Sequence, residues 1–186
     1  IEEGDITRSQ GDAICLVVAE NEKILEEAKK LVKIEYEVLK PISSIKEAED
    51  KNSPPIHPNG NLCQQRHVSR GDAIKAFEKC AYVVEESYTT PFTEHAFLEP
   101  ECAIAIPYKD GVKIFTTDQS VYDTRKETLI MFGWQDTPER VVVENKLIGG
   151  AFGGKEDVSI QHLAALASYK FNEKVKIKLS RDESCL

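Results

Sequence analysis

The chain has 186 residues, of which 41% are hydrophobic, so it can build a core in one ordinary domain or two small ones. Its formal net charge of −8 argues against a nucleic-acid-binding protein, because neutralising phosphates requires a concentrated basic surface. The longest apolar run, residues 13–19, has the length of a strand rather than of a membrane span, and no signal peptide is evident.

The five cysteines indicate a reducing setting. Their number is odd and no two have CxxC spacing, which argues against a disulfide framework, a zinc site or an iron–sulfur cluster held by this chain. Cys15 and Cys102 lie in apolar runs, so we expect them to be small core residues in a cytoplasmic protein. Because the chain opens on Ile1 in a polar stretch and stops abruptly, we also expect a fragment of a longer protein.

The first 45 residues predict a strand, a helix and a second strand. Residues 13–19 form an apolar run typical of a buried strand, and residues 34–38 alternate apolar and polar side chains as a half-buried strand does. Between them, Asn21 can cap a helix. The apolar stripe of that helix would comprise Ile24, Leu25, Ala28, Leu31 and Val32.

A proline- and asparagine-rich stretch follows at residues 46–69. Proline fixes φ and removes a backbone donor, so we expect no regular element there and interpret the stretch as an interdomain linker. Beyond it, Asp72 is placed to cap a short helix that carries Ile74 and Phe77.

The remaining residues predict a sheet with helices packed on it. Runs rich in β-branched residues indicate strands at residues 82–90, 102–107, 112–117, 140–148 and 175–179. The dipeptide at 110–111 is a hairpin signal. Ser120 with Asp123 starts a helix that ends at Gly133, and a second helix covers residues 157–171. The predicted fold class is α+β, with a mixed sheet and packed helices.

A glycine-rich loop with the sequence GGAFGGKE, residues 149–156, joins a predicted strand to the last helix. Glycine is needed where φ is positive or where the backbone approaches another group closely. One interpretation is a tight turn without further function. Another is a nucleotide-binding phosphate loop, since Gly149, Gly154 and Lys155 match GxxxxGK, but Glu156 stands where Ser or Thr would hold Mg²⁺.

Two further features could carry chemistry. His95 lies near Glu94 and Glu99, but a protein-held metal would need a second histidine or a cysteine, so we do not expect one. Gln119 stands where a strand gives way to a helix, a common position for a site residue, although it could simply bond a loop carbonyl.

Together these features resemble the molybdenum hydroxylases, the xanthine dehydrogenase and aldehyde oxidase family. The resemblance rests on the strand–helix–strand pattern, the segment EHAFLEPE (residues 94–101), Gln119 and GGAFGGKE, which occur in the family's order. It implies that residues 1–45 end an α/β hammerhead domain and that residues 46–69 are a linker. Residues 70–186 would form the N-terminal part of the molybdopterin-binding domain.

The resemblance implies a molybdopterin-dependent enzyme that hydroxylates a purine such as xanthine at a C–H carbon with water-derived oxygen. Gln119 would bond an oxygen ligand of molybdenum, and Phe152 and Gly153 would lie over the metal. Glu156 would face the substrate, because purine-oxidising members carry glutamate there and aldehyde-oxidising members tend to carry an apolar residue. An aldehyde-oxidising member of the family is the alternative.

The resemblance also implies partners. Iron–sulfur clusters and FAD would lie on other domains or subunits, and the catalytic base would lie beyond Leu186. This chain alone is therefore expected to bind no molybdopterin and to be inactive. Nucleic acid and membranes are not expected as partners, and a homo-oligomer is left open. A pure interaction module, which would need an exposed apolar patch, stays an alternative.

Overall fold

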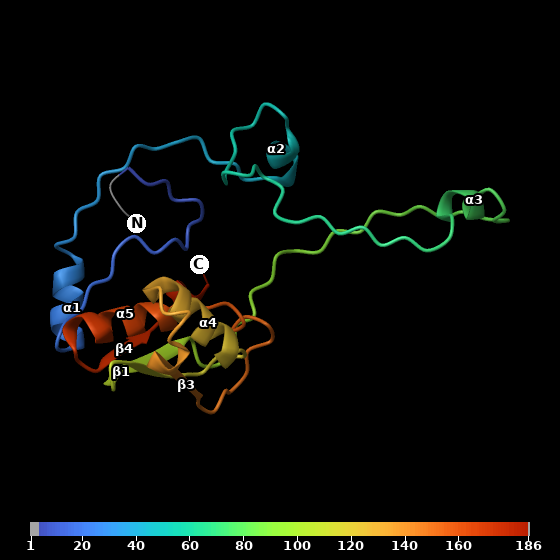
Figure 1. Cartoon of the computed structure of the whole chain (residues 1–186). Coiled ribbons are helices and arrows are strands. Elements are labelled where there is room, and N and C mark those ends of the chain that lie inside the picture. Colours follow the sequence, from blue (N-terminus) through green and yellow to red (C-terminus); the bar gives the residue numbers. More distant parts are fainter. Residues whose placement is uncertain (1–3, 186) are drawn as a thin grey trace. The chain divides into compact units, whose positions relative to one another are not determined.

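The computed structural model describes residues 4–185, so Ile1 and Leu186, the outer ends of the predicted domains, lie outside the described part. The described residues form two compact units. One unit comprises residues 10–32 and 93–185, and the other comprises residues 4–9 and 33–92. Figure 1 shows the course of the chain through its helices and strands.

The first unit is built on a four-stranded sheet with the strand order β3-β2-β1-β4. The strands are β1 (Cys102–Tyr108), β2 (Gly111–Thr116), β3 (Val141–Asn145) and β4 (Val175–Lys178). β1 pairs antiparallel with both β2 and β4, whereas β3 runs parallel to β2. The expected mixed sheet is therefore confirmed, at four of the five predicted strand positions.

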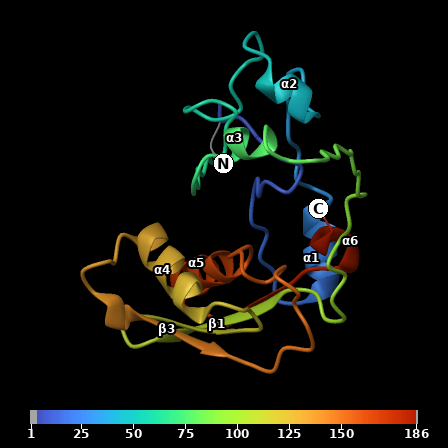
Figure 2. The same cartoon turned by 90° about the vertical axis from the view of Figure 1, so that its right-hand side faces the viewer.

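Two helices cover one face of this sheet (Figures 1 and 2). α4 (Val121–Phe132) contacts β3, and α5 (Gln161–Phe171) contacts β1, β2 and β4. Side chains alternate across a strand, so Ala103 and Ala105 of β1 are buried on the face that the helices cover. The core formed in this way comprises Ala103, Ala105, Val112, Ile114, Leu129, Val141, Ile160, Ala164 and Ala165. The predicted α+β class is confirmed.

α4 is also the connection between the parallel strands β2 and β3. The predicted cap is confirmed, because Ser120 Oγ accepts a hydrogen bond from the Asp123 backbone N–H at 3.4 Å. The helix ends at Gly133, whose φ of +68° suits glycine. A 3₁₀ turn, η1 (Pro138–Arg140), then leads into β3.

The hairpin between β1 and β2 confirms the signal at Asp110 and Gly111. Tyr108 pairs with Gly111, which leaves a two-residue turn in which Lys109 has a φ of +52°. A Cβ atom on Gly111 would lie 1.9 Å from the carbonyl oxygen of Arg140. Only glycine fits at this close approach.

The predicted start of the last helix is wrong, since α5 begins four residues later, at Gln161. The glycine-rich loop continues instead as successive turns. The Gly154 N–H donates to the Ala151 carbonyl at 2.8 Å, and the Glu156 N–H donates to the Gly153 carbonyl at 3.3 Å. No helix N-terminus therefore follows the loop directly, which removes the geometry that a phosphate loop requires.

The strand–helix–strand prediction is wrong outside its helix. α1 (Glu22–Lys29) forms, and the side chain of Asn21 caps it as expected. Residues 13–19 and 34–38 are not strands, and they belong to different units. A strand needs a neighbour to satisfy its backbone groups, and neither segment pairs with one within residues 4–185. Cys15, expected in a core, is accordingly exposed.

The last described element is a short helix that the sequence did not predict, α6 (Arg181–Ser184). Ser180 Oγ accepts from the Glu183 N–H at 3.2 Å, and Glu183 Oε2 accepts from the Ser180 N–H at 2.8 Å. This reciprocal capping box stabilises the helix start and places Arg181 in the first turn.

The second unit contains two short helices, α2 (Ile45–Glu49) and α3 (Ala73–Phe77). The predicted cap at Asp72 is confirmed, since its carboxylate accepts a hydrogen bond from the first turn of α3. α2 contradicts the expectation that residues 46–69 hold no regular element, because Ser44 supplies a cap and the helix ends before Pro54, the first proline of that stretch.

Residues 82–90 do not form the predicted strand. Tyr82 and Tyr88 are 91% and 88% exposed, so their side chains have no packed surface to lie on. High strand propensity means that side chains fit well on a packed surface, so it does not produce a strand where no such surface is present. In the part of the chain that the structure describes, no helix has the length and apolar character needed to cross a membrane.

Candidate functional site

The glycine-rich loop at residues 149–156 takes up left-handed backbone angles at three positions. φ is +134° at Gly150, +55° at Phe152 and +94° at Gly153. Glycine adopts such angles freely, whereas Phe152 does so at a cost of roughly 1–2 kcal/mol. The side chain of Phe152 is 76% exposed, so burial of its ring does not offset this cost. A strained, exposed aromatic residue is typical of a functional site.

Gln119 holds this loop through its amide and its backbone. Its Oε1 accepts hydrogen bonds from the Gly153 N–H at 2.9 Å and the Lys155 N–H at 3.3 Å, and its own N–H donates to the Lys155 carbonyl at 2.9 Å. Two donors meeting the amide oxygen fix which way the amide faces. Gln119 is exposed, and among residues 4–185 its Nε2 group makes none of the hydrogen bonds found.

Buried polar contacts fix the turn that carries Gln119. Asp118 is 2% exposed, and its carboxylate accepts from Thr124 Oγ1 at 2.5 Å. Asn145, the last residue of β3, accepts from the Asp118 N–H at 3.2 Å and donates to the Asp118 carbonyl at 2.8 Å. The ends of β2 and β3 are thereby tied together, so Gln119 and the loop leave the sheet at the same edge.

The segment EHAFLEPE packs directly against the loop. A Cβ atom on Gly154 would lie 2.8 Å from both His95 Nδ1 and Phe97 Cε1, and one on Gly149 would lie 2.0 Å from Glu99 Oε2. The bare backbone at these two glycines is what lets the segment approach so closely.

Phe97 is 1% exposed and lies between two cations. Lys155 Nζ lies 4.4 Å from the ring centroid, and Arg181 Cζ lies 5.7 Å from it. Arg181 also donates hydrogen bonds to the carbonyls of Phe97 and Leu98. Cation–π contacts of this kind contribute about 0.5–2 kcal/mol each. The ring therefore joins the loop, EHAFLEPE and α6.

The four predicted site residues lie on two segments in contact, the glycine-rich loop and the turn that carries Gln119. Gln119 and Gly153 are hydrogen-bonded, and Phe152 and Glu156 are both exposed on the loop. The Gly153 N–H group donates its hydrogen bond to Gln119 and is not free for a ligand. What Gly153 offers a ligand is consequently its lack of a side chain.

His95 does not form a metal cluster with its acidic neighbours. Its Nδ1 lies 3.6 Å from Glu94 Oε1, and its ring lies against Gly154. Among residues 4–185, no three His, Cys, Asp or Glu side chains come together in a way that could hold a metal ion.

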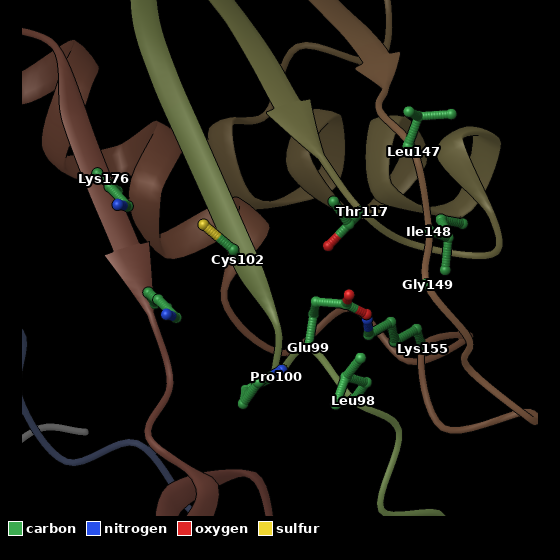
Figure 3. A pocket seen from close by; sticks show the side chains of 11 residues that line it. Leu98, Glu99, Pro100, Cys102, Thr117, Leu147, Ile148, Gly149, Lys155 and Lys176 are labelled. Atoms are coloured by element: carbon green, nitrogen blue, oxygen red, sulfur yellow. The ribbon is translucent and has the colours of Figure 1, made fainter.

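A pocket of about 700 Å³ lies beside the loop (Figure 3). Lys155 is a lining residue that is 1% exposed, and its buried Nζ has no hydrogen-bond partner in the described chain. Cys102, expected to be a core residue, is half-buried and lines the pocket. Sequence reasoning did not identify Lys155 as a pocket residue, although its place inside GGAFGGKE could have indicated that it lies at the site. The other lining residues are Leu98, Glu99, Pro100, Thr117, Leu147, Ile148, Gly149, Lys176 and Lys178.

Comparison with known proteins gives a consistent family. The chain is 34% identical over 181 residues to the nicotinate dehydrogenase large molybdopterin subunit of Eubacterium barkeri, covering 97% of this chain and 42% of the relative. It is 35% identical over 182 residues to a probable xanthine dehydrogenase subunit of Bacillus subtilis, covering 97% of this chain and 24% of the relative. The chain thus spans less than half of the length of these relatives.

Solved structures share the fold. The aldehyde oxidoreductase from Desulfovibrio desulfuricans superposes with a TM-score of 0.83 at 23% identity, over 94% of this chain and 20% of that one. Quinoline 2-oxidoreductase from Pseudomonas putida gives a TM-score of 0.77 at 22% identity, over 89% and 21% of the two chains. Residues 56–186 match the family described as the molybdopterin cofactor-binding domain. With Gln119 and GGAFGGKE assembled at one sheet edge, this chain belongs to the molybdopterin cofactor-binding domain family.

Proposed function

We propose that this chain forms the molybdopterin-contacting part of a molybdenum hydroxylase that oxidises a purine such as xanthine. Gln119, Phe152 and Gly153 would contact the cofactor, and Glu156 would contact the substrate. The chain matches 24% of a protein named as a probable xanthine dehydrogenase subunit, so the complete activity belongs to a longer polypeptide or an assembly.

The amide of the exposed Gln119, whose oxygen is held by the loop, is the observation that carries the proposal. Its oxygen is occupied by the Gly153 and Lys155 N–H groups, so both Nε2 hydrogens remain for an acceptor oxygen on the cofactor. The exposed ring of Phe152 and the bare Gly153 lie on the loop that this amide holds. The residues present therefore fit a large, oxygen-bearing cofactor laid against the loop.

The cofactor, when bound, would supply the oxygen transfer and take up the substrate's electrons. The residues of this chain would orient it. Gln119 would donate a hydrogen bond, and Phe152 would shield the face of the group from water. Because the Gln119 amide is already fixed by two hydrogen bonds, it would not have to reorganise during the reaction.

Glu156 supports a nitrogen heterocycle as the substrate. Its carboxyl group can accept a hydrogen bond from a ring N–H, or donate one to a ring C=O when protonated. An aldehyde offers no such N–H group. The Eubacterium barkeri relative is named a nicotinate dehydrogenase, so nicotinate, a smaller heterocycle, is the second candidate.

The remaining cofactors would lie elsewhere. We place the iron–sulfur clusters, FAD and the catalytic base on other domains or subunits of a cytoplasmic enzyme. Among the described residues, no three His, Cys, Asp or Glu side chains are grouped so that they could hold a metal ion.

The test compares the whole parent enzyme with its Gln119→Glu variant. Glutamate keeps an oxygen for the Gly153 and Lys155 N–H groups but lacks the Nε2 donor, so the loop should stay in place. We expect an unchanged unfolding temperature and a rate of xanthine oxidation lower by on the order of 10²-fold. Glu139→Gln, an exposed change in η1, is the control that should leave the rate unchanged.

Substrate choice is tested on the same enzyme by kcat/KM for xanthine, nicotinate and benzaldehyde. We expect Glu156→Gln to lower the value for xanthine by roughly tenfold or more while the value for benzaldehyde changes little. A wild-type enzyme that prefers benzaldehyde would overturn the purine proposal. Purified enzyme without molybdenum, measured by mass spectrometry, would overturn the function as a whole.

A further inference from the structure

We propose that the pocket lined by Lys155 is a binding site for a tetrahedral oxyanion. The ligand class is phosphate or a small phosphorylated molecule. The proposal rests on the pocket alone and does not require the molybdopterin assignment.

Lys155 is the central group of this site. An isolated buried ammonium group is costly unless it is paired. Its Nζ is buried yet has no hydrogen-bond partner in residues 4–185, and the ring of Phe97 at 4.4 Å satisfies it only through a cation–π contact. The three N–H donors of this lining residue therefore have no acceptor in the described chain. An anion entering the pocket would supply one.

Thr117 provides a second unpartnered donor. Its hydroxyl oxygen is buried without a hydrogen-bond partner among the described residues, and Figure 3 shows it directed into the pocket. Because β2 ends at Thr116, Thr117 already belongs to the turn that leads to Gln119. The glycine-rich loop and the turn after β2 thus each contribute a donor-bearing residue to the lining of the same pocket.

The charge of the lining favours an anion. Lys176 and Lys178 on β4 are exposed and add two positive charges to that of Lys155, while Glu99 is the single carboxylate of the lining. A net positive, concave wall concentrates anions from solution. Glu99 would oppose a bare anion at its end of the pocket, so it favours a ligand that also carries a hydroxyl or amino group.

The size of the pocket supports the same ligand class. Several donors approaching from different elements suit the four oxygens of a phosphate better than the planar pair of a carboxylate. A volume of about 700 Å³ exceeds that of inorganic phosphate and leaves room for the molecule that carries it. Since the backbone of Lys155 is held by Gln119, an anion at its Nζ would also stabilise the loop.

The experiment measures thermal unfolding of the 186-residue chain against inorganic phosphate at constant ionic strength, with chloride as the replaced ion. Binding to the folded state should raise Tm in a saturable way, which yields a Kd. We expect Thr117→Val and Lys178→Met each to weaken phosphate by about fivefold or more. Lys155→Met should abolish binding, and the other two variants decide the matter if that protein does not fold.

Matched controls exist for Thr117→Val and Lys178→Met. Thr116→Val removes a buried hydroxyl one residue earlier that does not line the pocket, and Lys174→Met removes an exposed lysine just before β4. Both should bind phosphate as the wild type does. The proposal is overturned if phosphate gives no saturable rise in Tm, or if the pocket variants and their controls respond alike.

Discussion

At the scale of single residues, Gly149 and Gly154 are both needed for close approach, but for different partners. An added Cβ at Gly154 would meet the rings of His95 and Phe97, and Phe97 is fully packed. At Gly149 it would meet only the end of the Glu99 side chain, which can move. Replacing glycine by alanine should therefore reduce stability more at Gly154, whose neighbours are packed rings, than at Gly149, whose neighbour can move.

We accordingly predict that Gly154→Ala lowers the free energy of unfolding by about 1–3 kcal/mol. Gly149→Ala should lower it by clearly less, because Glu99 can swing away. Urea denaturation of the two variants and the wild type checks this. Equal losses for both variants would mean that the packing of Phe97 does not limit the loop.

At the scale of elements, the parallel pair β2–β3 carries an ion-pair cluster. Lys113 of β2 lies 2.8 Å from Glu144 of β3, and Lys146 also donates to that carboxylate. These two hydrogen bonds lower the pKa of Glu144 from its ordinary 4.5 to about 2. Because the pKa is lower in the folded state, the resulting stability is present above pH 4.5 and is lost as the pH falls toward 2.

The prediction at this scale concerns the slope of stability against pH. In the acid range between 4.5 and about 2, the wild type should lose stability more steeply than Glu144→Gln, which cannot titrate there. The difference should shrink in high salt, because the cluster is partly exposed to solvent. Urea titrations at several pH values measure both slopes, and parallel curves would contradict the assignment.

Among the helices and strands, some were predictable from the sequence and others were not. Caps, the hairpin and the core strands were predictable, because Asn21, Ser120 and Gly111 act through neighbours in the chain. Strands at 13–19 and 82–90 were mispredicted, since a strand also depends on a partner that local pattern does not reveal.

The candidate site was predictable in part. Gln119 and the loop could be named because their types and order resemble a family, and the structure brings them into hydrogen-bond contact. The placement of Lys155 against Phe97 could not be foreseen, because it depends on packing between segments far apart in the sequence. A sequence pattern identifies candidate site residues, but it does not show in which direction their side chains point.

At the scale of the whole molecule, the two units differ in how much structure protects their backbones. The first contains the sheet and its buried core, whereas the second contains two five-residue helices and no named strand among its described residues. Backbone without buried contacts opens at low free energy and is accessible to proteases.

We therefore predict that limited proteolysis cuts first within residues 33–92, and that residues 102–178 survive as the resistant part. Mass spectrometry of the earliest fragments, with a protease of broad specificity, gives the order of cleavage. Early cuts inside β1 or α5 would contradict the division. Added phosphate should leave the cleavage within residues 33–92 unchanged, because those residues do not line the pocket.

The parallel arrangement of β2 and β3 has one more consequence. Since the chain must travel back along α4 before β3 can begin, the two strands finish at a common rim, where Asp118 and Asn145 meet. The return bend at residues 133–140 lies at the other rim. Extra residues inserted in that bend should leave the hydrogen bonds between Gln119 and GGAFGGKE undisturbed. The loops at one edge of the sheet could therefore lengthen during evolution while the site at the other edge is kept.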